Sequence, residues 1–207
     1  MTLIKICGIT SRKDLKLVMA AGADLLGFNI YPKSKRYIKR KMLADFLKNE
    51  KVKEKAVIVS VNEPVESLCG ILKHNRPAYV QLHGDETAGY AATLKEKCPG
   101  IKIIKKVNIE EREIFKDILE YADYLLCDTA SNGFGGSGKK FNWEKLNDID
   151  PQVRKKLFAA GGINPDNVGE VLKYNILGVD AATGTEKRPG KKDKKKVFEI
   201  VRKVRES

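Results

Sequence analysis

Short runs of apolar residues recur along the chain, and longer segments of mixed polarity separate them. Each run is rich in Val, Ile, Leu or Ala and is bounded by glycine or polar residues, which is typical of a buried β-strand. The predicted strands occupy residues 3–7, 24–30, 56–61, 78–82, 102–107, 124–128, 157–160 and 178–181.

The segments between the strands carry apolar residues at the three- and four-residue spacing of a helix face. The first of these helices can be capped by Thr10 or Ser11, and it ends at Gly22. Segment 109–122 is amphipathic throughout, whereas 142–149 is a short and weaker candidate. The predicted helical segments are 12–22, 39–49, 63–75, 85–97, 109–122, 142–149, 164–174 and the C-terminal segment.

Strands that alternate with helices predict right-handed crossovers and a parallel sheet. Eight strand–helix units favour a closed (β/α)8 TIM barrel in a lean version with short loops. We expect a single domain over residues 1–207, because no linker interrupts the pattern. An open doubly wound sheet is the alternative architecture. Its usual GxGxxG fingerprint is absent after the first strand, where "CGITSRKD" has one glycine.

The carboxyl ends of the strands share one mouth in a barrel of this kind, and active sites lie there. Cys7 ends the first predicted strand, Gln81 and His83 lie at the end of the fourth, and Asp128 ends the sixth. Asp180 lies in the eighth strand, which leads into a glycine-containing loop. These polar residues are therefore the candidates for chemistry and substrate binding.

Cys7 and Asp128 can act as base and acid on a substrate held between them. Lys5 shares the face of Cys7 because side chains repeat with period two, and it or Arg36 would favour the thiolate. Asp128 needs a pKa raised from about 3.9 to donate a proton near neutral pH. The structural alternatives are a cysteine that only packs in the core and an aspartate that caps a helix.

Two glycine loops follow the seventh and eighth predicted strands and predict a phosphate site. Glycine lets backbone N–H groups approach a ligand, and a following helix start adds a partial positive charge. The alternative is that these glycines only form tight turns. The predicted phosphate-binding residues are Gly161, Gly162, Thr183 and Gly184.

Arg36 lies in the basic loop "PKSKRYI", and its planar guanidinium can bind a carboxylate through paired hydrogen bonds. A solvated loop with surface charges is the alternative interpretation. Gln81 and His83 share one face of their strand end, where His83 can be a polar wall, a proton shuttle or a capping residue. The glycine-rich segment 131–143 is predicted to be a flap that closes over the mouth.

Composition narrows the class of protein. The chain has 207 residues, no apolar run long enough to span a membrane and no signal-like N-terminus, so we expect a cytoplasmic globular protein. Its four cysteines show no CxxC spacing and are expected to be reduced thiols. A zinc site is not expected, because His74 and His83 are the available histidines and neither lies near a cysteine pair.

The formal net charge is +13, from 40 Lys and Arg against 27 Asp and Glu. This excess is compatible with nucleic acid or anionic metabolites as ligands, but also with solvated helix faces. The densest basic run, "RPGKKDKKK" at 188–196, is predicted to begin the C-terminal helix. No aromatic–basic interleaving of a nucleic-acid binder accompanies it, so we expect no nucleic-acid partner and no membrane partner.

An ordered set of motifs spans residues 5–193 and resembles the phosphoribosylanthranilate isomerase family of tryptophan biosynthesis. The family is a lean (β/α)8 barrel, and its pattern implies Cys7 as general base and Asp128 as general acid. It also implies Arg36 at the anthranilate carboxylate. The motifs are "KICGIT", "PKSKRYI", "VQLHGDE", "LLCDT" with "GFGGSGKKFNW", "FAAGGINPDNV" and "GVDAATGTEKRPGKKD".

One departure concerns the predicted phosphate site. The last loop reads "DAATGTE", where the family more often has a pair of serines before the glycine. Ala182 removes one hydroxyl, so the phosphate contact is expected from backbone N–H groups or from Thr183.

The reaction implied by the resemblance is an Amadori rearrangement of N-(5-phosphoribosyl)anthranilate to 1-(2-carboxyphenylamino)-1-deoxyribulose 5-phosphate. It needs no metal, nucleotide cofactor or redox partner, so no cofactor is expected. The expected partner is the small phosphorylated anthranilate substrate. The sequence does not decide between a monomer and a homodimer.

Three rival functions stay open. A histidine-pathway aldose–ketose isomerase does the same type of rearrangement, but such barrels resemble fused halves with Asp where Cys7 ends the first strand here. A metal-dependent epimerase would need more His and Asp at the strand ends. A nucleic-acid binder would use the basic C-terminal segment.

Overall fold

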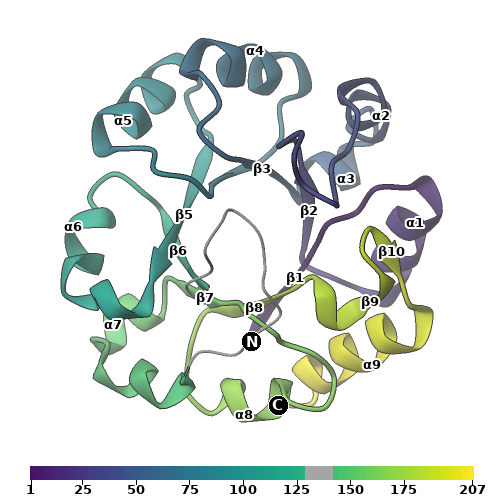
Figure 1. Cartoon of the computed structure of the whole chain (residues 1–207), viewed down its shortest axis with the longest axis vertical. Coiled ribbons are helices and arrows are strands. Elements are labelled where there is room, and N and C mark those ends of the chain that lie inside the picture. Colours follow the sequence, from purple (N-terminus) through teal and green to yellow (C-terminus); the bar gives the residue numbers. More distant parts are fainter. Residues whose placement is uncertain (129–141) are drawn as a thin grey trace.

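The computed structural model describes residues 1–128 and 142–207, and eight of its strands form one closed barrel (Figure 1). Each strand pairs in parallel with the next, and β8 closes the ring against β1. The predicted fold class is confirmed. The barrel strands are β1 (Leu3–Cys7), β2 (Leu25–Asn29), β3 (Ala56–Ser60), β4 (Tyr79–Leu82), β5 (Lys102–Asn108), β6 (Tyr124–Asp128), β7 (Leu157–Ala159) and β8 (Gly178–Ala181).

The inside of the barrel is apolar at the amino ends of the strands. Tyr124 packs against Tyr79 and against Phe158, with ring centroids 6.2 Å apart in each pair. Gly178 is required beside this cluster, because a Cβ there would lie 2.7 Å from the Phe158 ring and 2.6 Å from the Leu3 carbonyl oxygen. Side chains alternate along a strand, so the same inward register reaches polar residues at the carboxyl ends.

Helices surround the barrel, as Figure 1 shows, and a second apolar cluster lies between them and the strands. Helix α1 begins after Ser11, whose side chain accepts from the Asp14 N–H, and ends at Gly22 in the left-handed region. Both ends agree with the sequence prediction. The helices are α1 (Arg12–Ala21), α2 (Arg40–Phe46), α3 (Glu50–Lys53), α4 (Val65–Asn75), α5 (Ala88–Lys97), α6 (Phe115–Ile118), α7 (Pro151–Arg154), α8 (Val168–Leu172) and α9 (Lys194–Arg205).

Two predicted helices differ in the structure. Segment 109–122 is not one continuous helix, because a 3-10 helix η1 (Ile109–Ile114) precedes the short α6 and Glu111 has non-helical backbone angles. Segment 142–149 forms the 3-10 helix η2 (Trp143–Asp148). In both, anchoring apolar side chains such as Phe115 and Trp143 are buried, and packing against the barrel replaces the regular helix.

The basic run at 188–196 begins the last helix only with its residues 194–196, and the prediction is wrong for the residues before them. Residues 188–192 of the run belong to an antiparallel hairpin of β9 (Glu186–Arg188) and β10 (Lys191–Lys192), turned at Gly190, whose φ is +76°. Helix α9 starts only after this hairpin, where the Asp193 side chain accepts from the Lys196 N–H. Pro189 and Gly190 lie between the two strands, and a proline followed by a glycine is typical of a turn rather than of a helix start.

The same aspartate contact recurs in the two halves of the barrel. Asp24, directly before β2, accepts from the Ile4 N–H at 2.8 Å. Asp123, directly before β6, accepts from the Ile103 N–H at 2.8 Å. Each carboxylate thus ties the amino end of one strand to the preceding strand.

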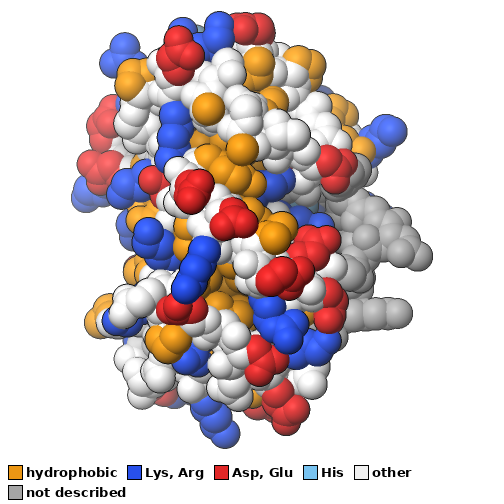
Figure 2. Space-filling view, turned by 90° about the vertical axis from the view of Figure 1, so that its left-hand side faces the viewer, with side chains coloured by type: hydrophobic (Ala, Val, Ile, Leu, Met, Phe, Trp, Pro, Cys, Tyr) orange, Lys and Arg blue, Asp and Glu red, His pale blue; other side chains and the backbone are white. Residues whose placement is uncertain are grey.

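The molecular surface mixes charges of both signs. Figure 2 shows Lys and Arg interleaved with Asp and Glu on one face, with apolar side chains between them. Ion pairs join neighbouring elements at the surface, such as Lys116 with Asp150 at 2.8 Å and Arg112 with Asp148 at 3.4 Å. Within residues 1–128 and 142–207, no helix has the length and apolar character needed to cross a membrane.

Candidate active site

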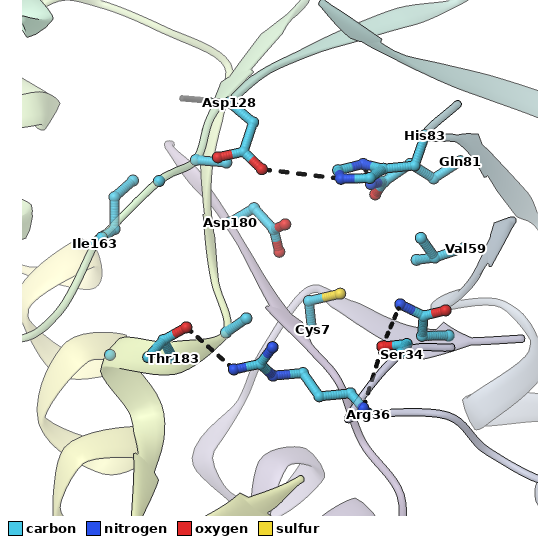
Figure 3. Close-up of a pocket in the computed structure, with 16 residues that line it drawn as sticks. Cys7, Ser34, Arg36, Val59, Gln81, His83, Asp128, Ile163, Asp180 and Thr183 are labelled. Atoms are coloured by element: carbon cyan, nitrogen blue, oxygen red, sulfur yellow. Dashed lines mark hydrogen bonds and ion pairs between the residues drawn. The ribbon is translucent and has the colours of Figure 1, made fainter. Parts of the chain in front are cut away.

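One pocket lies at the carboxyl ends of the barrel strands, and every predicted site residue lines it (Figure 3). The inward register of each strand explains this, because the polar residue at each strand end follows the apolar layer below it. The predicted residues on its wall are Cys7, Arg36, Gln81, His83, Asp128, Gly161, Gly162, Asp180, Thr183 and Gly184.

Cys7 stands beside a buried ion pair. Lys5 and Asp180 face each other in the β1–β8 pairing, and Lys5 Nζ lies 2.9 Å from Asp180 Oδ1. The Lys5 side chain is 0% exposed, so its charge is balanced inside the barrel by Asp180. Figure 3 shows the Asp180 carboxylate between Cys7 and Asp128.

Burial raises the pKa of the Cys7 thiol above its ordinary value. Lys5 and Lys192 lower the pKa of this thiol, whereas Asp180 raises it further. Lys5 therefore acts in the direction predicted from the sequence, but desolvation outweighs it. The resting side chain is mainly a thiol at neutral pH, and its thiolate, once formed, is a strong base.

Asp128 and His83 face each other across the mouth of the pocket. His83 Nε2 lies 3.9 Å from Asp128 Oδ2, and His83 Nδ1 lies 2.8 Å from Gln81 Nε2. In this arrangement the Gln81 amide donates to Nδ1, so the proton of the neutral imidazole sits on Nε2 and points toward the pocket. Gln81 was predicted at this wall, and its amide orients the His83 ring.

The His83 imidazole is neutral. Burial lowers its pKa from 6.5 to about 3, and Lys5, Lys106 and Lys105 lower it further in the same direction. A neutral imidazole can donate and accept hydrogen bonds but carries no charge toward Asp128. An uncharged ring suits the role of a polar wall, which stays a prediction.

Arg36 projects into the pocket with one edge of its guanidinium already bound. Nε donates to Glu186 Oε1 at 2.9 Å, and Nη2 donates to Glu186 Oε2 at 2.8 Å. Nη2 also donates to Thr183 Oγ1 at 3.1 Å. Nη1 donates no hydrogen bond to residues 1–128 or 142–207 and can donate to an anion in the pocket. Arg36 thus lies beside the predicted phosphate loop.

Gly8 explains why the chain turns immediately after Cys7. Its φ is +81°, and a Cβ there would lie 2.4 Å from the Arg36 Cδ. The Arg36 side chain therefore passes directly over a backbone position that only glycine leaves open. The Arg36 side chain therefore packs directly against the backbone at the end of β1.

The two glycine loops approach each other closely. Gly161 and Gly162 both have positive φ, of +80° and +67°, which turns the backbone after β7. A Cβ on Gly184 would lie 2.0 Å from the Ile163 carbonyl oxygen, so the loop after β8 rests on the loop after β7. Asn167 Nδ2 holds this arrangement by donating to the Gly162 carbonyl at 3.0 Å.

The pocket also contains residues that the sequence analysis did not select. Asn29 ends β2 and Ser34 lies in the loop that follows, and Asn29 Nδ2 donates to Ser34 Oγ at 3.1 Å. Asn29 could have been selected from the sequence, because side chains alternate along β2 and Asn29 shares the inward face of Gly27. The added lining residues are Asn29, Ser34, Val59, Ala160, Ile163 and Ala182.

The predicted flap at 131–143 lies outside the described residues except for its last two positions. Trp143 at its end is buried in the apolar cluster between strands and helices. Within residues 1–128 and 142–207, no group of three His, Cys, Asp or Glu side chains is placed to hold a metal ion.

Comparisons with known proteins agree with this geometry. A family model described as N-(5'phosphoribosyl)anthranilate (PRA) isomerase matches residues 4–203. The N-(5'-phosphoribosyl)anthranilate isomerase of Thermotoga neapolitana is 39% identical over 207 residues, which cover 99% of each chain. The crystal structure of phosphoribosyl anthranilate isomerase from Thermotoga maritima has a TM-score of 0.84 and 31% identity, covering 100% of both chains. A structure of such an enzyme in complex with reduced 1-(o-carboxyphenylamino)-1-deoxyribulose 5-phosphate has a TM-score of 0.80 and 29% identity over 100% of both chains.

Proposed function

Because the chain belongs to the N-(5'-phosphoribosyl)anthranilate isomerase family, we propose that Cys7 and Asp128 are the general base and general acid of its reaction. The chain is an isomerase of tryptophan biosynthesis and acts on N-(5'-phosphoribosyl)anthranilate. We assign the whole chain to one catalytic domain in the cytoplasm, with no cofactor.

The observation that carries the assignment is the placement of the two groups. Cys7 at the end of β1 and Asp128 at the end of β6 line the same pocket from different sides. In Figure 3 the thiol and the carboxylate point into one space, with Asp180 between them. A sugar held in this space has one face toward each group.

Asp128 starts the reaction as the acid. It protonates the furanose ring oxygen while the C1′–O bond breaks, and the anthranilate nitrogen lone pair forms the Schiff base. Asp128 is 8% exposed, and its carboxyl group reaches the pocket from the end of β6. To act as the acid, it must hold a proton when the substrate binds. The uncharged His83 imidazole faces this carboxyl group, with Nε2 3.9 Å from Asp128 Oδ2.

Cys7 continues the reaction as the base. Its thiolate removes the C2′ proton, and the electrons of that bond form the C1′–C2′ double bond of an enolamine. The enolamine then tautomerises, because C1′ gains a proton and the 2′ hydroxyl loses one, which gives the ketose. Lys5 stabilises the thiolate, and the raised pKa of Cys7 makes that thiolate more basic.

The remaining pocket groups hold the substrate. Asp180, paired with Lys5, accepts from a sugar hydroxyl at the centre of the pocket, and the Nε2–H of His83 faces the same space. The glycine loops with Thr183 bind the phosphate, while Arg36 binds the anthranilate carboxylate through Nη1. These remote contacts provide the orientation that both proton transfers require.

The decisive experiment follows anthranilate fluorescence after enzyme is added to fresh substrate. Cys7→Ser and Asp128→Asn should each lower kcat by about 10²-fold or more while retaining the fold. Asp123→Asn is the matched control, because Asp123 lies at the opposite end of β6, where it accepts from the Ile103 N–H and pairs with Lys95 at the surface. Near wild-type kcat in both site variants would refute the acid–base assignment.

Arg36→Ala tests the carboxylate assignment. We expect a raised KM with a smaller change in kcat, because a binding contact is lost. Anthranilate and inorganic phosphate, used separately as competitive inhibitors, show which anion Arg36 holds. Weaker inhibition by anthranilate alone supports the assignment, whereas weaker inhibition by phosphate alone would transfer Arg36 to the phosphate site beside Thr183.

A further inference from the structure

The β9–β10 hairpin brings a buried lysine to the mouth of the barrel. The Lys192 side chain is 0% exposed, although it lies in a run of lysines. Its Nζ donates to the Cys7 carbonyl at 2.6 Å, to the Ala182 carbonyl at 3.2 Å and to Thr185 Oγ1 at 3.1 Å. Nζ also lies 3.3 Å from Glu186 Oε1. Lys192 thus joins the end of β1 to the loop after β8.

Glu186 is the second buried charge of the hairpin, and its side chain is 2% exposed. Its carboxylate accepts from Arg36 at both oxygens, and Oε1 also accepts from Lys192 and from the Gly190 N–H at 3.3 Å. The two oxygens are therefore shared between Arg36, Lys192 and the hairpin turn. Thr10 Oγ1 donates to the Gly190 carbonyl at 2.6 Å and fixes that turn to the loop after β1.

These contacts form a continuous path from Cys7 through Lys192 and Glu186 to Arg36. We propose that Lys192 and Glu186 are positioning residues, which hold the Arg36 guanidinium and the carboxyl end of β1 in the geometry that the reaction needs. The inference rests on the proposed function, because it assigns its role through Arg36 and Cys7.

The charge balance of this cluster supports the role. Two cations, Arg36 and Lys192, share one carboxylate, so the buried cluster carries an excess positive charge. Arg36 lines the pocket, so part of that excess charge faces the pocket. An anionic carboxylate of the substrate completes the balance, and a fixed guanidinium binds it at lower entropic cost than a mobile one.

Charges from several elements reach the Cys7 thiol, and Lys192 is one of them. Lys5 from β1 and Lys192 from β10 lower the pKa of the thiol, and Asp180 from β8 raises it. Burial lowers the pKa of Lys192 itself, and Glu186 and Cys7 act against that shift. Arg36 faces the thiol from the loop after β2.

The test compares two adjacent lysines of one strand. Lys192→Met removes the buried charge, and Lys191→Met removes the neighbouring exposed one as a matched control. For Lys192→Met we expect KM to rise about tenfold or more and kcat to fall, because both the carboxylate contact and the base are displaced. Lys191→Met should keep both constants within about twofold of the wild type.

A second readout separates positioning from simple loss of structure. The pH midpoint of Cys7 alkylation by iodoacetamide, measured by mass spectrometry of the Cys7 peptide, should move up in Lys192→Met. It should move down in Glu186→Gln, because Arg36 and Lys192 then lose their counter-charge. A purely structural role would move both variants in one direction, as Cys7 becomes more exposed. Glu186→Gln should also raise KM.

The outcomes are distinct. Unchanged KM in both variants, with melting temperatures near that of Lys191→Met, would overturn the proposal. If Lys192→Met does not fold, Glu186→Gln decides by the same KM and alkylation criteria. If the wild type leaves substrate fluorescence unchanged, the proposed function fails instead, and opposite alkylation shifts still report the link between the hairpin and Cys7.

Discussion

His83 shows how burial sets the chemistry of a single side chain in this pocket. Its imidazole lies between the Gln81 amide and the Asp128 carboxylate, and lysines on β1 and β5 surround it. The imidazolium form of His83 would lose its hydration on burial and would be repelled by these lysines. The ring therefore contributes directed hydrogen bonds without changing the charge that a reacting sugar meets.

We predict that His83 stays neutral throughout the working range of the enzyme. Its pKa of about 3 lies well below the ordinary 6.5, so no protonation is expected between pH 8 and pH 5. The measurement is the pH dependence of the His83 ¹⁵N chemical shifts, assigned by comparison with His83→Gln. A midpoint near 6.5 would show that the ring is solvated and can act as a proton shuttle.

Ala182 stands where the family more often has a serine, and Ala182→Ser would restore the missing hydroxyl. It lines the pocket beside Thr183, whose hydroxyl already accepts from Arg36. Ala182→Ser should add a donor for the substrate phosphate and lower KM by about two- to tenfold, which is the effect of one added hydrogen bond. Inorganic phosphate should become a correspondingly better competitive inhibitor. Unchanged phosphate inhibition would show that position 182 does not face the phosphate.

At the scale of elements, the strands were predictable and several connections were not. Period-two alternation fixes both a strand and the face of its last residue, which is why Cys7 and Asp128 could be selected from the sequence. Segment 109–122 has the pattern of a helix, but packing of Phe115 against the barrel favours short 3-10 and α turns. Lys192 was hidden because its burial depends on a hairpin that folds back onto β1.

The contact between the β7 and β8 loops makes a prediction at the same scale. Gly184→Ala places a Cβ 2.0 Å from the Ile163 carbonyl oxygen, so the two loops must separate. We expect KM to rise about tenfold or more, because both loops contribute to the phosphate site. The melting temperature should also fall.

Gly169→Ala is the matched control for Gly184→Ala. Gly169 lies in α8, the helix that follows the loop after β7. A Cβ at this position meets no atom within 4 Å. Alanine in this exposed helical position should stabilise the protein by up to about 1 kcal/mol and leave KM unchanged. Equal KM values in the two variants would contradict the shared phosphate site.

At the scale of the whole molecule, the two ends of the barrel have separate tasks. The carboxyl ends hold the pocket and its buried charges, whereas the amino ends hold the aspartate contacts between neighbouring strands and the contact with α9. Helix α9 brings the last part of the chain back to the first strand, where Arg205 Nη1 donates to the Thr2 carbonyl at 3.3 Å. Changes at this end should therefore affect stability without affecting chemistry.

Arg205→Ala tests this separation. Arg205 Nη2 donates to Asp24 Oδ1 at 2.7 Å and to the Gly22 carbonyl at 2.9 Å, and the other oxygen of Asp24 accepts from the Ile4 N–H. Losing this partly buried network should lower the free energy of unfolding by about 1 kcal/mol in urea titrations.

Arg202→Ala is the control. Arg202 lies one turn earlier in α9 and pairs only with Glu206 among the described residues, so its loss should leave the free energy of unfolding nearly unchanged. Both variants should keep the kcat and KM of the wild type, because neither residue approaches the pocket. A fall in kcat for Arg205→Ala without loss of stability would show that the contacts at the amino ends of the strands influence the pocket at the carboxyl ends.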